Sequence, residues 1–206
     1  GSPLAGSIRI LGTNAIGLNP TARRSLGAVF VPEERIGHAA VADMTLVDNS
    51  YLTGDTRMNF SHRGLIDWPA VTRFTQKVVQ NFDVRTTGVD ALASSLSGGN
   101  LQKFIVGREI LQQPSLLVVS QPPWGVDAGA AAAIHEEIQR LVSAGAAVLM
   151  ISQDLDEVFL LSHRIAVISQ GTLSVTTPID EVSPEDIGLL MGVRHEVQPK
   201  VDHVAA

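Results

Sequence analysis

The 206-residue sequence contains no cysteine, and aromatic residues make up only 4% of it. Without cysteine the protein forms no disulfide bond and offers no thiolate to a metal, which suits a reducing compartment. No apolar run approaches the roughly 20 residues that a membrane-spanning helix needs. The first residues also lack the basic and then apolar pattern of a signal peptide. We therefore expect the chain to meet a membrane only through a partner.

Basic residues are few and scattered. Lysine and arginine number 15 against 21 aspartates and glutamates, which gives a formal charge of −6. A chain of this charge, with no basic stretch, is not expected to bind nucleic acid as its main partner. The hydrophobic content of 45% is typical of a globular protein, and the length suits about one domain with a core of its own.

Short apolar runs alternate with helical patterns along most of the chain. We expect strands at residues 7–11, 26–31, 116–119, 148–151, 164–168 and 172–175, and helices at 101–111, 129–144, 155–161 and 179–191. This alternation predicts a mainly parallel α/β sheet with helices on both faces. Residues 12–14 are expected to form a turn, and Asn19 to cap a short helix.

Between residues 45 and 96 strand-like runs disappear, and helical patterns at 45–51 and 67–82 replace them. In the second pattern Asp67 is the expected N-cap, and Pro69 fits the first turn. One face of this helix would carry the apolar side chains of Val71, Phe74, Val78 and Phe82.

The stretch Ser95–Phe104, with the sequence S-L-S-G-G-N-L-Q-K-F, contains a helix start. Ser97 is a good N-cap, and Gly98 and Gly99 allow the backbone to pass very close to a ligand. Free N–H groups and the positive end of the helix dipole make such a turn an anion site, most naturally for phosphate. Taken alone, the same residues also fit a loop that caps an ordinary helix.

The motif L-S-G-G-N-L-Q-K at 96–103 resembles the signature motif of ATP-binding-cassette (ABC) ATPases, in the form found in importers of simple sugars and nucleosides. The run at 116–119, followed by Q-P-P-W-G-V-D, resembles that family's Walker B strand and D-loop. The run at 148–151, followed by S-Q, resembles its switch strand. V-P-E-E-R at 31–35 is similar to the Q-loop of carboxy-terminal cassettes in double-cassette importers, and it also fits a solvated charged turn. The resemblance covers about residues 6–171.

The resemblance implies an α/β fold, an ABC-type P-loop NTPase cassette with an inserted helical subdomain. It divides the chain into an early-strand and Q-loop region at 1–44, a helical subdomain with the signature motif at 45–111, an α/β core at 112–177, and a C-terminal helix and tail at 178–206. No stretch matches the phosphate loop G-x-x-x-x-G-K-[ST]. We therefore expect an amino-terminally truncated cassette, the carboxy-terminal one of a double-cassette importer subunit without its Walker A motif.

Three positions depart from the family's catalytic pattern. The Walker B strand of that family ends in Asp and Glu, where this chain has Ser120 and Gln121, and the usual switch histidine is Gln153 here. A glutamine can hydrogen-bond a water but cannot take its proton, and general-base catalysis is worth ~10²–10⁴-fold in rate. We expect that this chain does not hydrolyse ATP by itself.

The resemblance implies instead that the chain supplies half of a composite ATP site. ABC cassettes pair head to tail, so the signature of one cassette closes on the nucleotide that the other holds. ATP and Mg²⁺ would be bound together with another ATP-binding cassette. Transmembrane permease subunits would be further partners, which places the chain peripherally on the cytoplasmic side of the plasma membrane. The residues assigned to cofactor binding are Ser97, Gly98, Gly99, Asn100, Gln102, Glu33 and Asp127, with no separate metal site.

Other interpretations stay open at this stage. Asp127 also fits a helix N-terminal residue favoured by the helix dipole. The fold can serve as a dimerisation and docking module that binds no nucleotide. A DNA-maintenance ATPase would need a coiled-coil insertion and a basic surface, and a metabolic enzyme would need a recognisable catalytic set; the sequence has none of these. Loss of the phosphate-loop strand would expose a sheet edge, which predicts self-association.

Overall fold

The computed structural model describes residues 6–123 and 125–192. The described residues form two compact units, which divide between Gln153 and Asp154. Within the described residues, every helix is too short or too polar for a membrane span.

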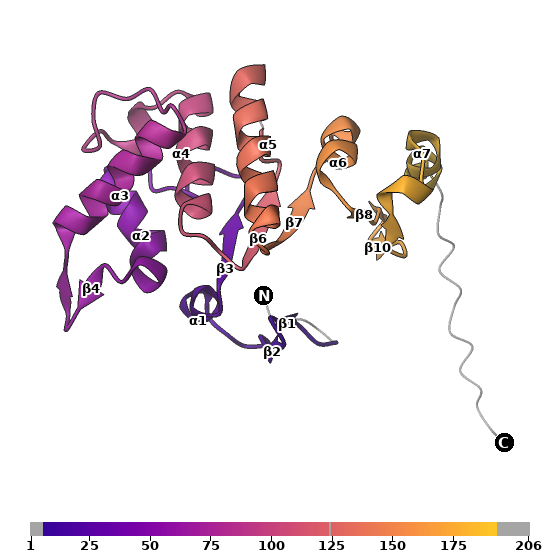
Figure 1. Cartoon of the computed structure of the whole chain (residues 1–206), viewed down its shortest axis with the longest axis horizontal. Helices are drawn as coiled ribbons and strands as arrows, with labels where there is room; N and C mark the ends of the chain where they lie inside the picture. Colours follow the sequence, from indigo (N-terminus) through magenta and orange to yellow (C-terminus); the bar gives the residue numbers. More distant parts are fainter. Residues whose placement is uncertain (1–5, 124, 193–206) are drawn as a thin grey trace. The chain divides into compact units, whose positions relative to one another are not determined.

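A three-stranded parallel sheet forms the centre of the first unit (Figure 1). Its order is β3 (Ala28–Val31), β6 (Leu116–Ser120) and β7 (Ala147–Ile151), and the register aligns Val31 with Val119 and Val119 with Met150. The prediction of a mainly parallel sheet is confirmed. The first strand begins two residues later than expected, because Leu26 caps the preceding helix and Gly27 has a φ of +98°.

A short hairpin and a one-and-a-half-turn helix precede the sheet. Strands β1 (Arg9–Ile10) and β2 (Thr13–Asn14) pair antiparallel, and Leu11 and Gly12 form the turn with φ values of 47° and 79°. The expectation that residues 12–14 form the turn is therefore wrong, because the turn lies one residue earlier. Helix α1 (Pro20–Ser25) begins at the predicted cap, where the Asn19 side chain accepts from the N–H of Ala22 at 2.8 Å.

Residues 45–111 are mainly helical. Helix α2 (Leu46–Met58) begins at a capping box formed by Thr45 and Asp48, and it runs a full two turns longer than predicted. Helix α3 (Trp68–Asn81) begins at the predicted cap Asp67, and the four predicted apolar residues of its inner face are all buried. A short 3₁₀ turn (Ala93–Ser95) leads into helix α4 (Gly98–Ile110).

The expectation that strands are absent from this region is wrong. Strands β4 (Ser61–His62) and β5 (Leu65–Ile66) form an antiparallel hairpin between α2 and α3. Its turn uses Arg63 and Gly64, whose φ values are 51° and 81°. Each strand has only two residues, too few to produce an alternating pattern in the sequence.

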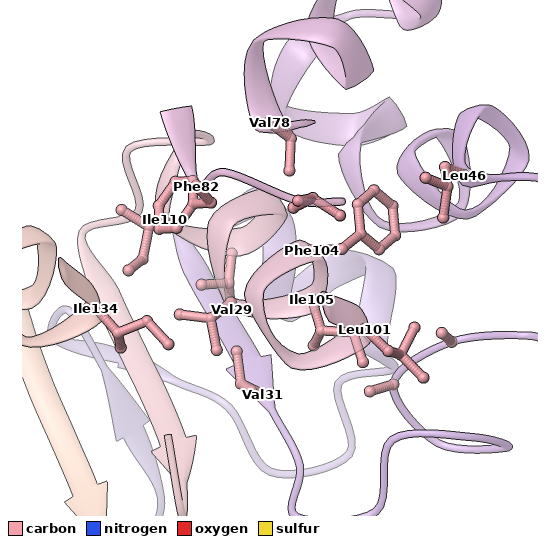
Figure 2. Packing of buried hydrophobic residues seen from close by; sticks show 14 of the residues in the cluster. Val29, Val31, Leu46, Val78, Phe82, Leu101, Phe104, Ile105, Ile110 and Ile134 are labelled. Carbon is pink, nitrogen blue, oxygen red and sulfur yellow. The ribbon is translucent and has the colours of Figure 1, made fainter. Parts of the chain in front are cut away.

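Helix α4 is the most deeply packed helix of the first unit. It lies between the sheet and helices α2 and α3, and it also packs against α5 (Ala128–Ser143). Figure 2 shows Phe104 and Ile105 of α4 among Leu46, Val78 and Ile134, all of them buried. Nearly every residue of α4 after Asn100 is buried, so the helix is anchored on several sides.

The two faces of the sheet differ. One face, with Val31 and Val119, is covered by α4 and α5. On the other face Phe30, Leu149 and Ile151 are 49%, 55% and 49% exposed. The expectation of helices on both faces is therefore wrong for this described part of the sheet, where a small cluster around Ile10, Ala15 and Ala28 covers only the start of β3.

The second unit contains short elements. Helix α6 (Leu155–Leu161) is as predicted, and the predicted turn Gln170–Gly171 joins β9 (Ile168–Ser169) to β10 (Thr172–Leu173). The expected strand 164–168 is instead divided into β8 (Arg164–Ile165), which pairs with β11 (Thr177–Pro178), and β9.

The predicted last helix is also divided, into a 3₁₀ turn (Ile179–Glu181) and helix α7 (Pro184–Gly192). Ser183 causes the break, because it exchanges capping hydrogen bonds with Asp186 and thereby starts a new helix. The prediction for the tail after residue 192 lies outside the described residues.

Candidate functional site

The carboxyl ends of the three parallel strands meet at one edge of the sheet, which we call the carboxyl edge. Glu33 follows β3, Ser120 ends β6 with Gln121 next to it, and Gln153 follows β7. The N–H of Gln121 donates to the carbonyl oxygen of Ile151 at 2.8 Å, which ties the ends of β6 and β7 together. Ligands of open α/β sheets bind outside such an edge. The structure thus places these four predicted site residues together at the carboxyl edge.

Gln121 has an unusual backbone at this edge. Its φ is +52°, a left-handed conformation that a non-glycine residue rarely adopts, and the residue is only 7% exposed. Neither Gln121 nor the half-buried Ser120 carries a carboxylate. Nowhere in residues 6–123 and 125–192 do three or more His, Asp or Glu side chains gather in a way that would hold a metal ion.

The residues 97–100, which we call the signature turn, form the start of α4. Ser97 is the N-cap, as predicted: its hydroxyl oxygen accepts from the N–H of Asn100 at 3.4 Å and from the Asn100 side-chain amide at 2.9 Å. The Asn100 side-chain oxygen accepts from the N–H of Arg85 at 2.9 Å. Asn100 therefore stabilises the turn, while Ser97 and Gly98 are the exposed members that a ligand can reach.

Gln102 does not face the ligand side. Its side chain is 2% exposed, and its amide nitrogen donates to the carbonyl oxygen of Pro122 at 2.8 Å. This bond attaches the first turn of α4 to the loop after β6. Gln102 thus holds the backbone of the site rather than presenting its own side chain to solvent.

Asp127 is the N-cap of α5, and its carboxylate accepts from the N–H of Ala130 at 3.0 Å. This hydrogen bond, with a further contribution from Lys103, holds the pKa of the exposed Asp127 carboxyl below its ordinary value. Asp127 is therefore ionised at neutral pH, and the structure shows it in the capping role.

Arg35 and Gly125 also belong to this surface, although the sequence analysis assigned them no role. An ideal Cβ on Gly98 would lie 2.7 Å from Nη1 of Arg35, and one on Gly125 would lie 2.7 Å from its Nη2. An ideal Cβ on Gly99 would lie 3.1 Å from the carbonyl oxygen of Gly125. Arg35 stood in a motif that the sequence analysis noted, as the last residue of V-P-E-E-R. Its contacts could not be predicted, because Gly98 and Gly125 are far from it in the sequence.

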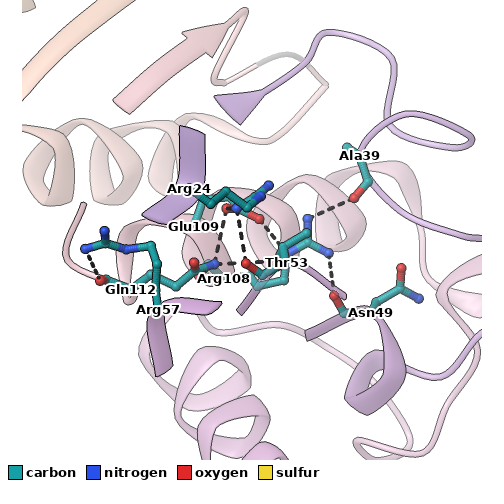
Figure 3. Close-up of polar contacts among 8 residues, drawn as sticks. All are labelled: Arg24, Ala39, Asn49, Thr53, Arg57, Arg108, Glu109 and Gln112. Carbon is teal, nitrogen blue, oxygen red and sulfur yellow. Dashed lines mark hydrogen bonds and ion pairs between the residues drawn. The ribbon is translucent and has the colours of Figure 1, made fainter. Parts of the chain in front are cut away.

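Behind the signature turn, α4 carries a buried ionic network that the sequence analysis missed (Figure 3). The carboxylate of Glu109 accepts from Arg24 and from Arg108, each at 2.9 Å, and from the Gln112 side chain at 3.2 Å. Burial opposes ionisation of Glu109, yet Arg108 and Arg24 together hold the pKa of this carboxyl below its ordinary value. The network fixes α4 at the end far from the turn.

A surface hollow of about 460 Å³ lies at the opposite end of the strands from the signature turn and the carboxyl edge. It is lined by the segment before β6 and the last turns of α5, at the amino ends of the strands.

Comparisons with known proteins bear on the fold and on the family. No family model matches the sequence. The nucleoside import ATP-binding protein NupA of Lactococcus lactis is 36% identical over 187 residues, 91% of this chain and 37% of NupA. The glucose import ATP-binding protein TsgD13 of Haloferax volcanii is 35% identical over 189 residues, 91% of this chain and 34% of TsgD13. The chain thus spans about a third of the length of these relatives.

Among solved structures, a dimeric post-hydrolysis state of the ATP-binding cassette MJ0796 bound to ADP and Pi matches with a TM-score of 0.72. The match covers 87% of this chain and 75% of that one, with 16% sequence identity. At this identity the likeness concerns the fold alone. The chain has the fold of an ATP-binding cassette, as the signature motif predicted.

Proposed function

We propose that this chain is a non-hydrolysing cassette of an ABC importer ATPase subunit, which supplies its signature turn to an ATP site shared with another cassette. The observation that carries the proposal is the exposed Ser97–Gly98 pair at the start of α4, beside the carboxyl edge of the sheet. Free N–H groups at a helix start bind phosphate oxygens, and the Ser97 hydroxyl adds a donor.

The carboxyl edge supports a half-site rather than a whole one. A hydrolytic site needs a group that orients and deprotonates water, and Ser120, Gln121 and Gln153 offer no carboxylate or imidazole. Glu33 is exposed at this edge and would contribute an oxygen ligand to Mg²⁺. The competent cassette would hold most of the nucleotide, and this chain would position and stabilise the transferring phosphate through electrostatic contacts.

The names of the relatives guide the choice of cargo and partners. NupA and TsgD13 are named as nucleoside and glucose import proteins, and we propose nucleoside or simple-sugar uptake for this chain. Residues 45–111 would form the helical subdomain that contacts transmembrane permease subunits, which keeps the chain peripheral on the cytoplasmic side of the plasma membrane. The segments 1–44, 112–177 and 178–206 would be the early-strand region, the α/β core and the C-terminal part.

A direct test uses a chimera of NupA in which the 187 matched residues are replaced by this chain. We expect the chimera to hydrolyse ATP and to restore nucleoside uptake to cells that lack NupA. Replacing Ser97 with Arg blocks the start of α4, so it should abolish both activities. Ser94→Arg is the matched control, since Ser94 is also exposed and lies three residues earlier, so this substitution should be tolerated.

Calorimetric titration of Mg-ATP separates the alternatives. We expect no binding by this chain alone, and tighter binding by the chimera than by its Ser97→Arg variant. Turnover by the isolated chain would contradict the assignment of Ser120 and Gln121 as non-hydrolysing. A folded chimera that is indifferent to Ser97→Arg would favour the docking module that binds no nucleotide.

A further inference from the structure

Three segments that are distant in the sequence meet at one guanidinium group. Nη1 of Arg35 lies beside Gly98, and Nη2 lies beside Gly125, in each case 2.7 Å from the position of an ideal Cβ. The segment after β3, the signature turn and the loop before α5 therefore share a contact with a single side chain. No other described glycine of the signature turn or that loop has an arginine so near it.

The absence of a side chain at both glycines is what admits the guanidinium. A real Cβ atom essentially never approaches another atom within 3.0 Å, so alanine at Gly98 would displace Arg35. Gly125 has a φ of +69° and is favoured for its backbone as well. Gly98 is an ordinary helical residue, so the requirement there is one of space.

The dipole of α4 does not favour this position of Arg35. The start of α4 is the positive end of the helix dipole, where a cation is disfavoured. The contact therefore does more for the mutual arrangement of the three segments than for the stability of α4. Gly99 adds to this arrangement, because its backbone packs against the carbonyl oxygen of Gly125.

We propose that Arg35 is a positioning residue that holds the signature turn against the loop 125–127 and the segment that follows β3. Its consequence for catalysis rests on the proposed function: Arg35 fixes the Ser97 hydroxyl and the Gly98 N–H where a nucleotide on another cassette meets them. We expect the held turn to stabilise the transition state more than the bound ground state. A small displacement of the turn would misalign its donors with the transferring phosphate and would weaken nucleotide binding less.

The contact itself is tested in the 206-residue chain by a double-mutant cycle, independently of any ATPase activity. Hydrogen-exchange protection of the α4 amides is measured for Arg35→Ala, Gly98→Ala and the double variant. The measured quantity is the change in protection that Gly98→Ala causes, and we expect it to be less favourable by about threefold when Arg35 is present than when it is absent. Equal effects of Gly98→Ala in both backgrounds would overturn the contact.

Gly188 provides the matched control for this cycle. It lies in a helix, as Gly98 does, and an ideal Cβ there meets nothing within 4 Å. The effect of Gly188→Ala should be the same with and without Arg35. If the Gly98→Ala chain does not fold, the contact is tested instead by comparing the NMR spectra of the Arg35→Lys variant and the unsubstituted chain. We then expect the amide chemical shifts of Gly98, Gly99 and Gly125 to change and that of Gly145 to stay the same. Unchanged chemical shifts at Gly98 and Gly125 would refute the proposal.

The positioning role is tested in the NupA chimera. We expect Arg35→Ala to lower kcat for ATP about tenfold per folded molecule while KM changes less than about threefold, and Arg35→Lys to recover part of the loss. A purely structural role would reduce only the folded fraction, so an unchanged kcat per folded molecule would overturn this part. A chimera that is inactive before any substitution would count against the proposed function, and the exchange cycle would still decide the contact.

Discussion

Arg108 and Glu109 are adjacent in α4 and form a buried ion pair, with 2.9 Å between Nε and Oε1. The guanidinium of Arg108 also donates to the backbone oxygens of Ala39 and Asn49, at 2.8 and 3.0 Å. One side chain of α4 thus binds the segment after β3 and the helix α2 at once. Together with Arg24 on Glu109, this network connects the signature helix to three other segments of the unit.

We expect Glu109→Gln to lower the free energy of unfolding by about 3–5 kcal/mol at pH 7, because it leaves Arg108 buried without a counter-charge. The pKa of Glu109 is lowered in the folded state, so its ionised form stabilises the fold above the ordinary carboxyl pKa of about 4.3. That contribution is lost as the pH falls through the lowered value. The difference between the two proteins should therefore narrow in acid.

Urea unfolding between pH 7 and pH 3 measures this difference. The control is Glu137→Gln, because Glu137 pairs with Arg140 at the surface of α5. This substitution should lower the free energy of unfolding by less than about 1 kcal/mol. A difference that stays constant over this range would contradict the role of the Glu109 charge.

Gly107→Ala tests the close approach of α4 to the end of α3. An ideal Cβ on Gly107 would lie inside contact distance of the Phe82 ring, which is itself buried. We expect overpacking to lower the free energy of unfolding by about 1–3 kcal/mol, which is measured as faster hydrogen exchange in α3 and α4. The loss should shrink when Phe82→Leu is introduced as well, and a loss independent of residue 82 would speak against this packing.

Local rules predicted the helix starts well. Asn19, Asp67 and Ser97 each cap a helix with a side-chain oxygen, and each was recognisable because the cap depends on residues only three positions away. The β4–β5 hairpin was missed because its turn has an arginine in a left-handed conformation, which carries no sequence signal.

The candidate site was predictable in its members and less so in their roles. The motif grouped Gln102 with the exposed residues of the signature turn, but the helix places its side chain inward against Pro122. Arg35 was missed for the opposite reason. Its contacts with Gly98 and Gly125 depend on tertiary structure across 63 and 90 residues of sequence, the differences between these residue numbers.

The capping box at the start of α2 provides a third stability test. The Thr45 hydroxyl oxygen accepts from the N–H of Asp48 at 3.0 Å, and the Asp48 carboxylate accepts from the N–H of Thr45 at 3.2 Å. Thr45→Ala should cost about 1 kcal/mol and increase hydrogen exchange in the first turn of α2. Thr87→Ala, at an exposed position in a loop, should have no comparable effect. Equal changes in the free energy of unfolding for the two variants would show that the cap does not stabilise the protein.

The outer edge of β7 predicts self-association. In the described sheet β7 has a strand partner on one side only, and Leu149 and Ile151 next to that edge are about half exposed. Unpaired backbone groups beside apolar side chains favour pairing with another chain. We expect light scattering to show a mass that rises with concentration, and we expect Leu149→Lys to suppress the rise because a buried lysine would be costly. Leu65→Lys is the control, since Leu65 is 76% exposed on the β4–β5 hairpin and should leave association unchanged. A clean monomer over a wide concentration range would contradict the prediction.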